Sequence, residues 1–441
     1  MPVEDRSRVV ALDKRRVWHP YTAMQQYRDA VDPLVIVRAS GSRLFDADGR
    51  SYLDGNASWW TAALGHRHPR LVAALAAQAA RLMHCSLAST THEQAACLAE
   101  ELVAVAPEGL TRVFYSDDGS TAVEAALKMA FQYWQQNGHP RRHRFISLAG
   151  AFHGDTLGAV SVGGLAAFRA VFGPLLFDVI HAPDPGEGEA GWERAVDGIE
   201  AVLDSEREEI AAVLIEPLLQ GASGMRIWPA HLLGRLREIT RSADCLLIAD
   251  EVFTGYGRTG AMWGCDHADV TPDLLCTAKA FSGGVLPMAA TLATERVFDG
   301  FRGGKDRALM HGHTFCGNPL GAAVAREVLA IYRDEGVVAQ ARDKAPLLRA
   351  GFERLAALEG VERVRSLGMA AAADLGAGGY YGGVGWRVFE AARARGAYIR
   401  PLGDTIYLCP PLTITKPELE QLLGILNESI EEVLRAGPGS R

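Results

Sequence analysis

The chain has 441 residues, of which 48% are hydrophobic and 22% charged, a balance typical of a folded globular protein and not of a disordered one. Its 45 basic and 53 acidic residues leave a net charge of −8 with no basic block, which argues against a nucleic-acid or anionic-membrane surface. No stretch approaches the roughly 18 uninterrupted apolar residues of a membrane span, and the charged N-terminus has no apolar signal segment, so we expect a cytoplasmic protein.

Cysteines and histidines suggest neither a disulfide framework nor a metal site. The seven cysteines are scattered, odd in number and without a C-x-x-C pair, as expected of buried thiols in a reducing compartment. Histidines at metal-like spacing occur at His66 and His68 and at His311 and His313, but neither pair has a third ligand nearby. We therefore expect no bound metal.

The first third of the chain predicts one hairpin followed by helices. Residues 41–53 alternate apolar and polar side chains around Asp48-Gly49, which indicates a β-hairpin. Apolar residues at spacings of three and four then predict helices over 68–82, 93–105 and 121–136.

From residue 144 onward the pattern becomes strand, long connection, strand. Helical segments such as 190–203 and 230–241 separate short apolar runs that predict strands at 144–148, 179–181, 211–215, 245–249, 274–277 and 288–293. This alternation is typical of βαβ units, so we predict an α/β fold with a mostly parallel sheet.

The C-terminal third has a different pattern. Helices are predicted over 319–333 and 337–358, and a Gly/Ala-rich stretch at 368–385 leads to a further helix and to an extended segment at 397–409. We predict a large α/β domain over residues 66–330, and a small α+β domain formed by both chain ends, residues 1–65 and 331–441.

The segment CLLIADEVFTGYGRTG, residues 245–260, allows two interpretations. Its glycines spell G-x-G-x-x-G after a strand, as in a dinucleotide-binding site. However, five residues separate Asp250 from Tyr256, and no amphipathic helix follows the glycines. Both features argue against a nicotinamide cofactor. In the other interpretation Asp250 presents a carboxylate beyond the strand end, with Val252 on the same side of the chain. By itself, an aspartate there could equally cap a turn.

Two further segments place reactive groups at the same edge of the predicted sheet. Lys279 follows the strand 274–277, 279 − 250 = 29 residues after Asp250, and a lysine in a cleft can lose its proton and form a Schiff base. Gly119-Ser120-Thr121 opens a helix, whose unpaired N–H groups favour a phosphate. A phosphate cradle, an acid and a lysine together are what a pyridoxal phosphate enzyme needs.

The segments IADEVFTGYGRTG, AKAFSGG and HGHTFCGNPLGAA, in that order, resemble the class III, fold-type I aminotransferases over essentially the whole chain. Within this family WHPYT, DGNASWWTAALGHRHP, FYSDDGSTAVEAALKMAFQYW, HGDT, EPLLQGASGM and RPLGDTIYLCPP are most similar to the adenosylmethionine–8-amino-7-oxononanoate aminotransferases of biotin synthesis. The resemblance implies pyridoxal 5'-phosphate as cofactor, 8-amino-7-oxononanoate as amino acceptor, and a homodimer whose active site lies between the subunits.

The resemblance also implies the cofactor contacts, residue by residue. Lys279 matches the lysine that binds the cofactor covalently and moves a proton, and Asp250 matches the partner of the pyridine nitrogen. Thr314, with His313 beside it, matches phosphate contacts made by the neighbouring subunit. The remaining cofactor contacts implied in this way are Gly119, Ser120, Phe152 and Val252.

For the substrate, Arg400 matches a clamp for the acceptor's single carboxylate, which suits a bidentate guanidinium. The other implied substrate contacts are Tyr21, Trp59, Phe152, Lys279, Gly312 and Tyr407. Because successive side chains point to opposite sides, we expect one member of the Trp59-Trp60 pair to lie in the core.

Three departures from the family pattern bear on the amino donor. Phe152 replaces the usual tyrosine, which keeps ring stacking but removes a hydroxyl, and His313 replaces a proline found in many members that use adenosylmethionine. GAVSVGGL (158–165) and RPLGD resemble the branch that uses lysine. We expect S-adenosyl-L-methionine as donor, with lysine as the alternative.

Three further interpretations remain open at this point. The chain could be another class III aminotransferase that acts on an ω-amine or diamine, a catalytically silent binding protein of the same fold, or a nicotinamide oxidoreductase. The Trp59-Trp60 pair with Arg400 argues against the first, and retention of Lys279 and Asp250 argues against the second.

Overall fold

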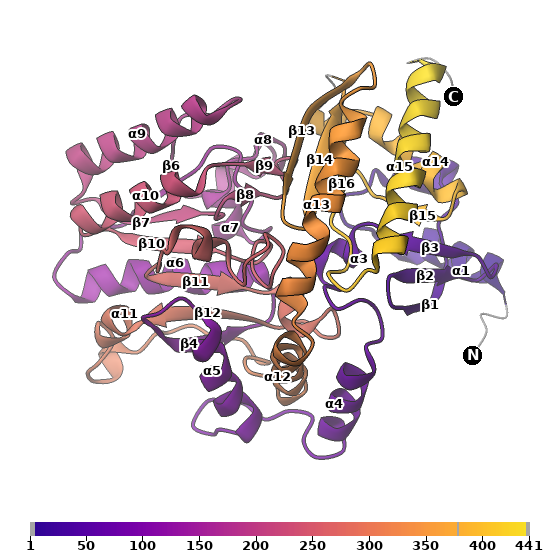
Figure 1. Cartoon of the computed structure of the whole chain (residues 1–441). Helices are drawn as coiled ribbons and strands as arrows, with labels where there is room; N and C mark the ends of the chain where they lie inside the picture. The colour runs from indigo at the N-terminus through magenta and orange to yellow at the C-terminus, as the bar shows by residue number, and fades with distance from the viewer. Residues whose placement is uncertain (1–4, 377–378, 438–441) are drawn as a thin grey trace.

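A seven-stranded sheet forms the centre of the larger part of the molecule in the computed structural model, which describes residues 5–376 and 379–437 (Figure 1). Its strands, in the order in which they lie in the sheet, are β4 (Leu110–Ser116), β12 (Ala289–Thr294), β11 (Leu274–Thr277), β10 (Leu246–Asp250), β7 (Ile210–Ile215), β5 (Arg144–Ser147) and β6 (Ile180–His181). β12 runs antiparallel to both of its neighbours, and every other pairing is parallel. The carboxyl ends of β4, β7, β10 and β11 therefore lie at one edge.

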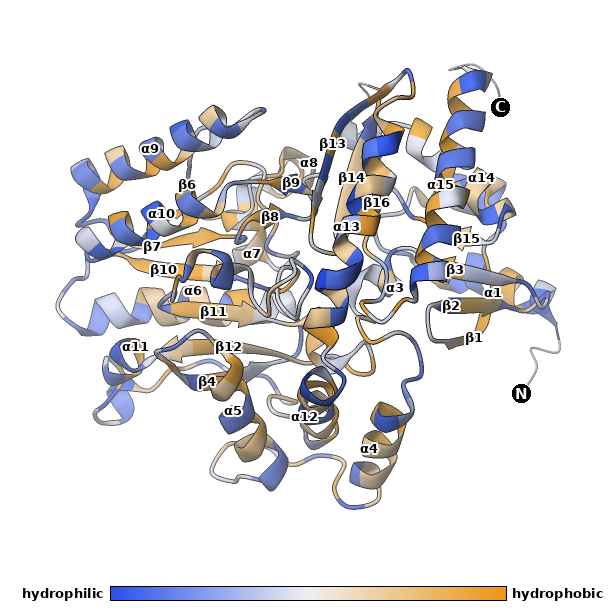
Figure 2. Cartoon of the chain, in the orientation of Figure 1, coloured by the Kyte–Doolittle hydropathy of each residue, from blue (hydrophilic) through white to orange (hydrophobic). Residues whose placement is uncertain are grey.

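Helices cover both faces of this sheet. In β10, Leu246 and Ile248 pack toward α6 (Gly119–Gln136), while Leu247 and Ala249 pack toward α9 (Glu189–Glu206) and α10 (Ala230–Ser242) on the other side. Because both faces are buried, the inner strands β7, β10 and β11 are mainly hydrophobic, as their orange colour in Figure 2 shows. This is why uninterrupted apolar runs predicted them.

A second group of helices covers the β4 end of the sheet. It consists of α4 (Pro69–Ala79), α5 (Glu93–Val105) and α12 (Pro319–Asp334), whose buried leucines and valines pack against β11 and β12. The remaining short elements of this part are α7 (Leu157–Val162), α8 (Ala166–Arg169), α11 (Glu295–Asp299), β8 (Leu219–Gln220), β9 (Arg226–Ile227) and the 3-10 helices η1 (Gly173–Leu175), η2 (Gly264–Ala268), η3 (Lys279–Ser282) and η4 (Lys305–Arg307).

The smaller part contains two sheets and both chain ends (Figure 1). One sheet has the order β1 (Ile36–Ser40), β2 (Arg43–Asp46), β3 (Ser51–Asp54) and β15 (Ala397–Tyr398), and the other has the order β13 (Val361–Leu367), β14 (Ala370–Leu375) and β16 (Thr405–Leu408). Helices α1 (Arg6–Arg16), α2 (Met24–Ala30), α13 (Val337–Leu355), α14 (Val384–Ala394) and α15 (Lys416–Ala436) and the 3-10 helix η5 (Gly379–Tyr381) complete it. Because β15 pairs with β3, N-terminal and C-terminal segments share a sheet.

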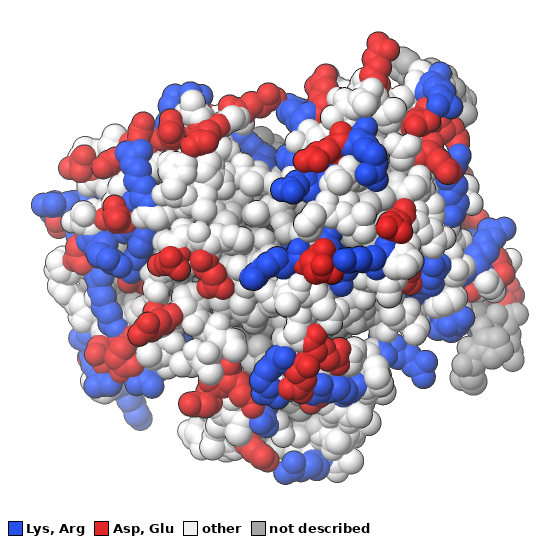
Figure 3. Space-filling view, viewed as in Figure 1, with Lys and Arg blue, Asp and Glu red and all other residues white. Residues whose placement is uncertain are grey.

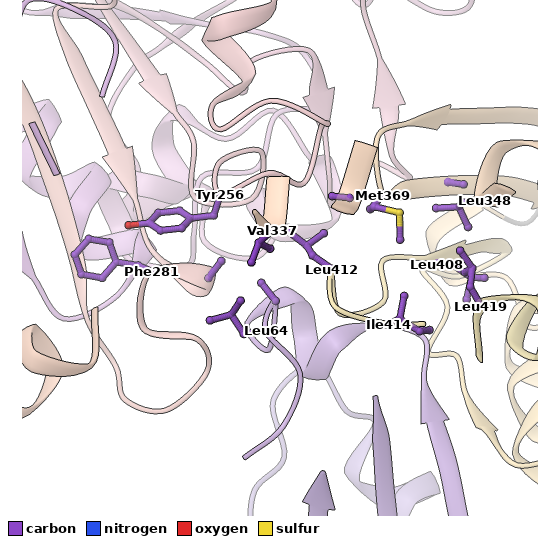
Figure 4. Packing of buried hydrophobic residues seen from close by; sticks show 14 of the residues in the cluster. Leu64, Tyr256, Phe281, Val337, Leu348, Met369, Leu408, Leu412, Ile414 and Leu419 are labelled. Atoms are coloured by element: carbon purple, nitrogen blue, oxygen red, sulfur yellow. The ribbon is translucent and has the colours of Figure 1, made fainter. Parts of the chain in front are cut away.

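One hydrophobic cluster joins the two parts (Figure 4). Tyr256 and Phe281 reach it from the larger part, and Val337, Leu412 and Ile414 reach it from the smaller one. The continuous core fixes the smaller part against the carboxyl edge of the large sheet. The predicted domain limits at residues 65 and 330 stay predictions.

Most of the predicted elements are confirmed, and six strands of the described chain are additional. The hairpin around Asp48-Gly49 is β2 and β3, and the α/β fold with a mostly parallel sheet is present. The strands that were not predicted are β1, β4, β8, β9, β13 and β14, and the extended segment 397–409 divides into β15 and β16 in two different sheets.

Charges of both signs are interspersed over the face that Figure 3 shows. No helix within residues 5–376 and 379–437 is long and apolar enough to cross a membrane. All seven cysteines lie in these ranges and are free thiols.

Candidate active site

An amine and a carboxylate meet at the carboxyl edge of the large sheet. Asp250 is the last residue of β10, and its register partner on the parallel strand β11 is Cys276. Lys279 opens η3, two residues after β11 ends. Both side chains line one cavity of about 1200 Å³, so the two groups that the sequence placed at strand ends do share a site.

Lys279 is held in an apolar corner of this cavity. Its Nζ lies 4.8 Å from the centroid of the Trp60 ring and 5.8 Å from that of Phe253. Burial lowers the pKa of the amine, against the opposing influence of the carboxylates of Asp250 and Glu216. A lowered pKa leaves more of the amine neutral, which is the nucleophilic form.

Asp250 is fixed by two hydrogen bonds. Its Oδ2 lies 2.7 Å from Nδ1 of His153, and its Oδ1 accepts the backbone N–H of Val252 at 3.1 Å. The His153 side chain is fully buried, and no described residue pairs with its Nε2. With Asp250 ionised, Nδ1 of His153 donates the proton, and the carboxylate has a single orientation. His153 was not singled out from the sequence, although it lies in the HGDT segment.

The start of α6 has the properties of a phosphate site. Asp118 caps the helix by accepting the N–H of Thr121 at 3.0 Å, whereas the N–H groups of Gly119 and Ser120 donate to no described residue. A side chain would not fit here: a Cβ added to Gly119 would lie 2.7 Å from Val252, and one added to Gly154 would lie 2.1 Å from Ser120 Oγ. Unpaired N–H groups at a helix start suit a phosphate, and the glycines leave room for close approach to this helix start.

Glu216 is a second buried carboxylate at the cavity, and sequence reasoning missed it. It directly follows β7, and its two oxygens accept the N–H of Phe152 at 2.9 Å and of Gly221 at 3.0 Å. Burial raises the pKa of this carboxyl to about 7. Glu216 therefore fixes the backbone that carries the Phe152 ring. Its position immediately after a predicted strand is the sequence feature that could have identified Glu216 as a site residue.

The acid pair Asp250-Glu251 has divided roles. Glu251 does not line the cavity; its carboxylate accepts the N–H groups of Gly264 and Cys265, both at 2.8 Å, and the hydroxyl of Thr254 at 2.5 Å. Burial raises the pKa of this carboxyl to about 7. Glu251 thus holds the glycine-rich turn after β10, and no helix follows Gly260 until the short η2. The nicotinamide interpretation lacks the helix start that it requires.

Arg400 lies at the mouth of the cavity between aromatic rings. Its guanidinium carbon is 4.8 Å from the centroid of the Trp59 ring and 5.5 Å from that of Trp386. Within the described chain no carboxylate lies within 4.0 Å of its guanidinium nitrogens, in contrast to most arginines of this protein. Arg400 also lines a second cavity of about 1800 Å³, which shares Tyr21 and Trp59 with the first. A free guanidinium in such a place suits an anionic ligand.

One member of the tryptophan pair, Trp60, is buried in the core, as expected, although both members line the cavity that holds Lys279. Trp59 is 41% exposed and lines both cavities, whereas Trp60 is 5% exposed. This division results from an unusual turn, α3 (Ala57–Trp60), in which all four residues have left-handed backbone angles, with φ of 46°, 45°, 64° and 71°. Each non-glycine residue in this conformation costs about 1–2 kcal/mol, so the surrounding structure must hold the turn in place.

Further aromatic rings continue the wall. The Tyr21 ring lies 5.6 Å from that of Trp59 and 5.7 Å from that of Phe168, and Phe168 lies 5.1 Å from Phe152. The hydroxyl of Tyr21 donates to Asp155. The rings thus form a continuous apolar surface from Phe152 to Trp59; Phe168 was not predicted.

Four of the predicted site residues lie outside the cavity that holds Lys279. Tyr407 is fully buried behind Trp60, at 6.0 Å between ring centroids, and borders only the second cavity. Gly312, His313 and Thr314 border neither, although Nδ1 of His313 lies 3.4 Å from the carboxylate of Asp117. Their contribution from a neighbouring subunit stays a prediction. The cavity does bring together Lys279, Asp250, Gly119, Ser120, Phe152, Val252, Tyr21, Trp59 and Arg400.

Comparison with known proteins gives one consistent result. Residues 24–430 match the family Aminotransferase class-III. The chain is 42% identical to the adenosylmethionine-8-amino-7-oxononanoate aminotransferase of Geobacter sulfurreducens, over 98% of this chain and 99% of the relative. The crystal structure of the enzyme of that name from Methanocaldococcus jannaschii superposes with a TM-score of 0.92 at 37% identity, covering 97% of this chain and 99% of that one. An amine transaminase from an uncultivated Pseudomonas species, solved in its PLP-bound form, gives 0.90 at 34% identity, with 95% and 99% covered.

Proposed function

The chain belongs to the class III aminotransferases, and from this premise we propose that it transfers an amino group to 8-amino-7-oxononanoate, forming 7,8-diaminononanoate in biotin synthesis. The observation that carries the proposal is one cavity in which a buried lysine and a fixed carboxylate lie beside a free helix start, with an unpaired arginine at the mouth. The amino donor that we propose is S-adenosyl-L-methionine.

Members of this family depend on pyridoxal 5'-phosphate, and the residues of the cavity fit it. Gly119 and Ser120 offer two free N–H groups to the phosphate, and Phe152 and Val252 offer apolar surfaces to the ring. When bound, the cofactor supplies an electron sink for the electrons left after deprotonation of the amino-bearing carbon.

Two side chains move or hold the protons. Lys279, whose pKa is lowered by burial, would hold the cofactor and would then take the proton from the substrate carbon. Asp250, whose carboxylate is oriented by His153, would pair with the pyridine nitrogen and hold a proton there. Glu216 keeps the Phe152 ring in place through the backbone.

The substrate side of the cavity matches an amphiphile. The acceptor has one carboxylate at the end of an apolar chain, so it needs one charged anchor and an apolar lining. Arg400 is the anchor, and the rings of Trp59, Tyr21 and Phe168 are the lining.

Substitution of Arg400 by Ala is expected to raise the KM for 8-amino-7-oxononanoate by about 30-fold or more, because a charge-assisted pair worth at least about 2 kcal/mol is lost. The amino-donor half-reaction, followed by the absorbance change of the cofactor with donor alone, is expected to change by less than about twofold. Arg395→Ala is the matched control, since Arg395 borders the second cavity but is paired with Glu432. Equal damage to both half-reactions would remove the clamp assignment.

A donor screen tests the function as a whole. With 8-amino-7-oxononanoate as acceptor, adenosylmethionine is expected to give the fastest product formation among adenosylmethionine, lysine and simple diamines. Faster turnover with lysine would favour the alternative that GAVSVGGL and RPLGD suggest. Transfer from diamines to simple aldehydes, with none to the oxononanoate, would contradict the proposal and favour the ω-amine alternative.

We also infer a cytoplasmic homodimer in which Gly312, His313 and Thr314 complete the partner's site. In support, Thr314 is exposed on the single chain, and the adjacent side chains of Met310 and Phe315 are 85% and 58% exposed. Large apolar side chains in such positions are typical of an interface.

A further inference from the structure

The turn that presents Trp59 is strained, so some group must hold it. All of Ala57, Ser58, Trp59 and Trp60 are left-handed, and none of them is a glycine. Strained backbone of this kind persists only where its surroundings over-determine it, and it concentrates at functional sites.

A single buried carboxylate holds the turn. Asp54, at the end of β3, is fully buried, and its Oδ2 accepts the N–H of Ser58 at 2.8 Å and the Ser58 hydroxyl at 3.1 Å. Its Oδ1 accepts the N–H of Asn56 at 3.1 Å. His66 Nε2 lies 2.8 Å from Oδ2, so the carboxylate ties the start and the middle of the turn to a third segment of chain.

The same turn is tied to the segment that carries Arg400. The side chain of Asn56, whose own N–H is held by Asp54, accepts the backbone N–H of Arg400 at 2.6 Å. The guanidinium of Arg400 in turn lies over the Trp59 ring, 4.8 Å from its centroid. Arg400 is thus connected to Asp54 in two ways. Its backbone is bonded to Asn56, and its guanidinium lies over Trp59, which the turn held by Asp54 carries.

We propose that Asp54 is a positioning residue for carboxylate recognition: it holds the left-handed turn 57–60 so that Trp59 and Arg400 together form the anchor of the acceptor. Asp54 itself lines neither cavity and so acts only through these residues. The proposal rests on the proposed function, because it assigns Arg400 and Trp59 to the acceptor.

Asp54→Asn tests the proposal, since an amide keeps the size of the side chain but cannot accept from both Asn56 and Ser58. The KM for 8-amino-7-oxononanoate is expected to rise about tenfold or more, with the donor half-reaction changed by less than about twofold. The matched control is Asp46→Asn in the same sheet. Asp46 is also buried and accepts two backbone N–H groups and a hydroxyl, from Asp48, Arg50 and Tyr52, but has no contact with the turn.

Ser58→Gly provides the rescue, because glycine adopts left-handed angles without strain. In the variant carrying both Asp54→Asn and Ser58→Gly, the acceptor KM is expected to return to within about threefold of that of Ser58→Gly alone, because the residue that the carboxylate holds is then no longer strained. Melting temperatures of all variants show how far each change affects the whole fold.

The outcomes separate this inference from the proposed function. Wild-type protein that does not aminate the oxononanoate contradicts the function itself. Wild-type activity with an acceptor KM unchanged in Asp54→Asn, or raised equally in Asp46→Asn, overturns the positioning role. Failure of Asp54→Asn to fold even with Ser58→Gly, while Asp46→Asn folds, also overturns it, since the carboxylate would then serve the fold as a whole.

Discussion

Substitution of Lys279 by Ala is expected to lower the rate of amino transfer by about 10⁴-fold or more. Two proposed functions depend on this one amine: the covalent attachment of the cofactor, and the base that moves the proton at the substrate carbon. The amine is suited to both because burial beside Trp60 and Phe253 lowers its pKa. Single-turnover rates with adenosylmethionine measure the loss directly.

A chemical test locates the same amine without relying on turnover. Purified protein is expected to be yellow, and reduction with borohydride is expected to bleach it and leave the cofactor on the peptide that contains Lys279. Lys344→Ala is the control, because Lys344 is also buried with a pKa lowered by burial, but lies in α13 outside the cavity. Cofactor found on any other peptide, or a colourless protein that binds NAD, would overturn the assignment.

The central sheet was predictable because each of its inner strands is buried on both faces. β7 and β10 are apolar at every position up to the acid that ends or follows them. One sequence pattern therefore predicted both the strands and the carboxyl edge of the sheet. β4 escaped prediction because Thr111 and Arg112 in its first half are exposed, which breaks the apolar run.

Two missed strands of the smaller part, β13 and β14, form a hairpin that pairs with the more distant strand β16. β14 is a run of alanines ending in Asp374 and Leu375, a composition that by itself favours a helix or a loop. It becomes a strand because β13 and β16 pair with it on both sides. Asp374 is satisfied by Arg363 and Arg365 of β13, a contact that no local pattern predicts.

Family motifs predicted the groups that we propose contact the cofactor, whereas the contacts that hold these groups in place are evident only in the three-dimensional structure. His153 bonds to Asp250 across 97 residues, and Glu216 bonds to the Phe152 backbone across 64. The sequence singled out Asp250 rather than its neighbour Glu251, but it did not show what Glu251 does. Only the fold shows that Asp250 lines the cavity while Glu251 binds the turn at Gly264 and Cys265.

Asp250→Asn is expected to lower turnover by about 10²- to 10⁴-fold while the protein still folds and binds pyridoxal 5'-phosphate. The amide has the shape of the carboxylate and can still bond to His153, so the architecture of the site is retained. It has no charge, however, and cannot keep a proton on the pyridine nitrogen, so the electron sink is lost. Turnover and the pH dependence of the cofactor absorbance are the two measurements.

Asp273→Asn is the matched control for this substitution. Asp273 is another buried aspartate, but it directly precedes β11 at the opposite edge of the sheet, where it accepts the N–H of Leu247 at 2.9 Å and pairs with Arg237 at 2.7 Å. Its substitution is expected to lower the melting temperature and to leave turnover per folded molecule nearly unchanged. Equal loss of turnover in both variants would mean that any buried charge at this sheet supports activity, and Asp250 would lose its specific role. A loss of turnover in Asp250→Asn alone would show that activity depends on a carboxylate at the carboxyl edge of the sheet.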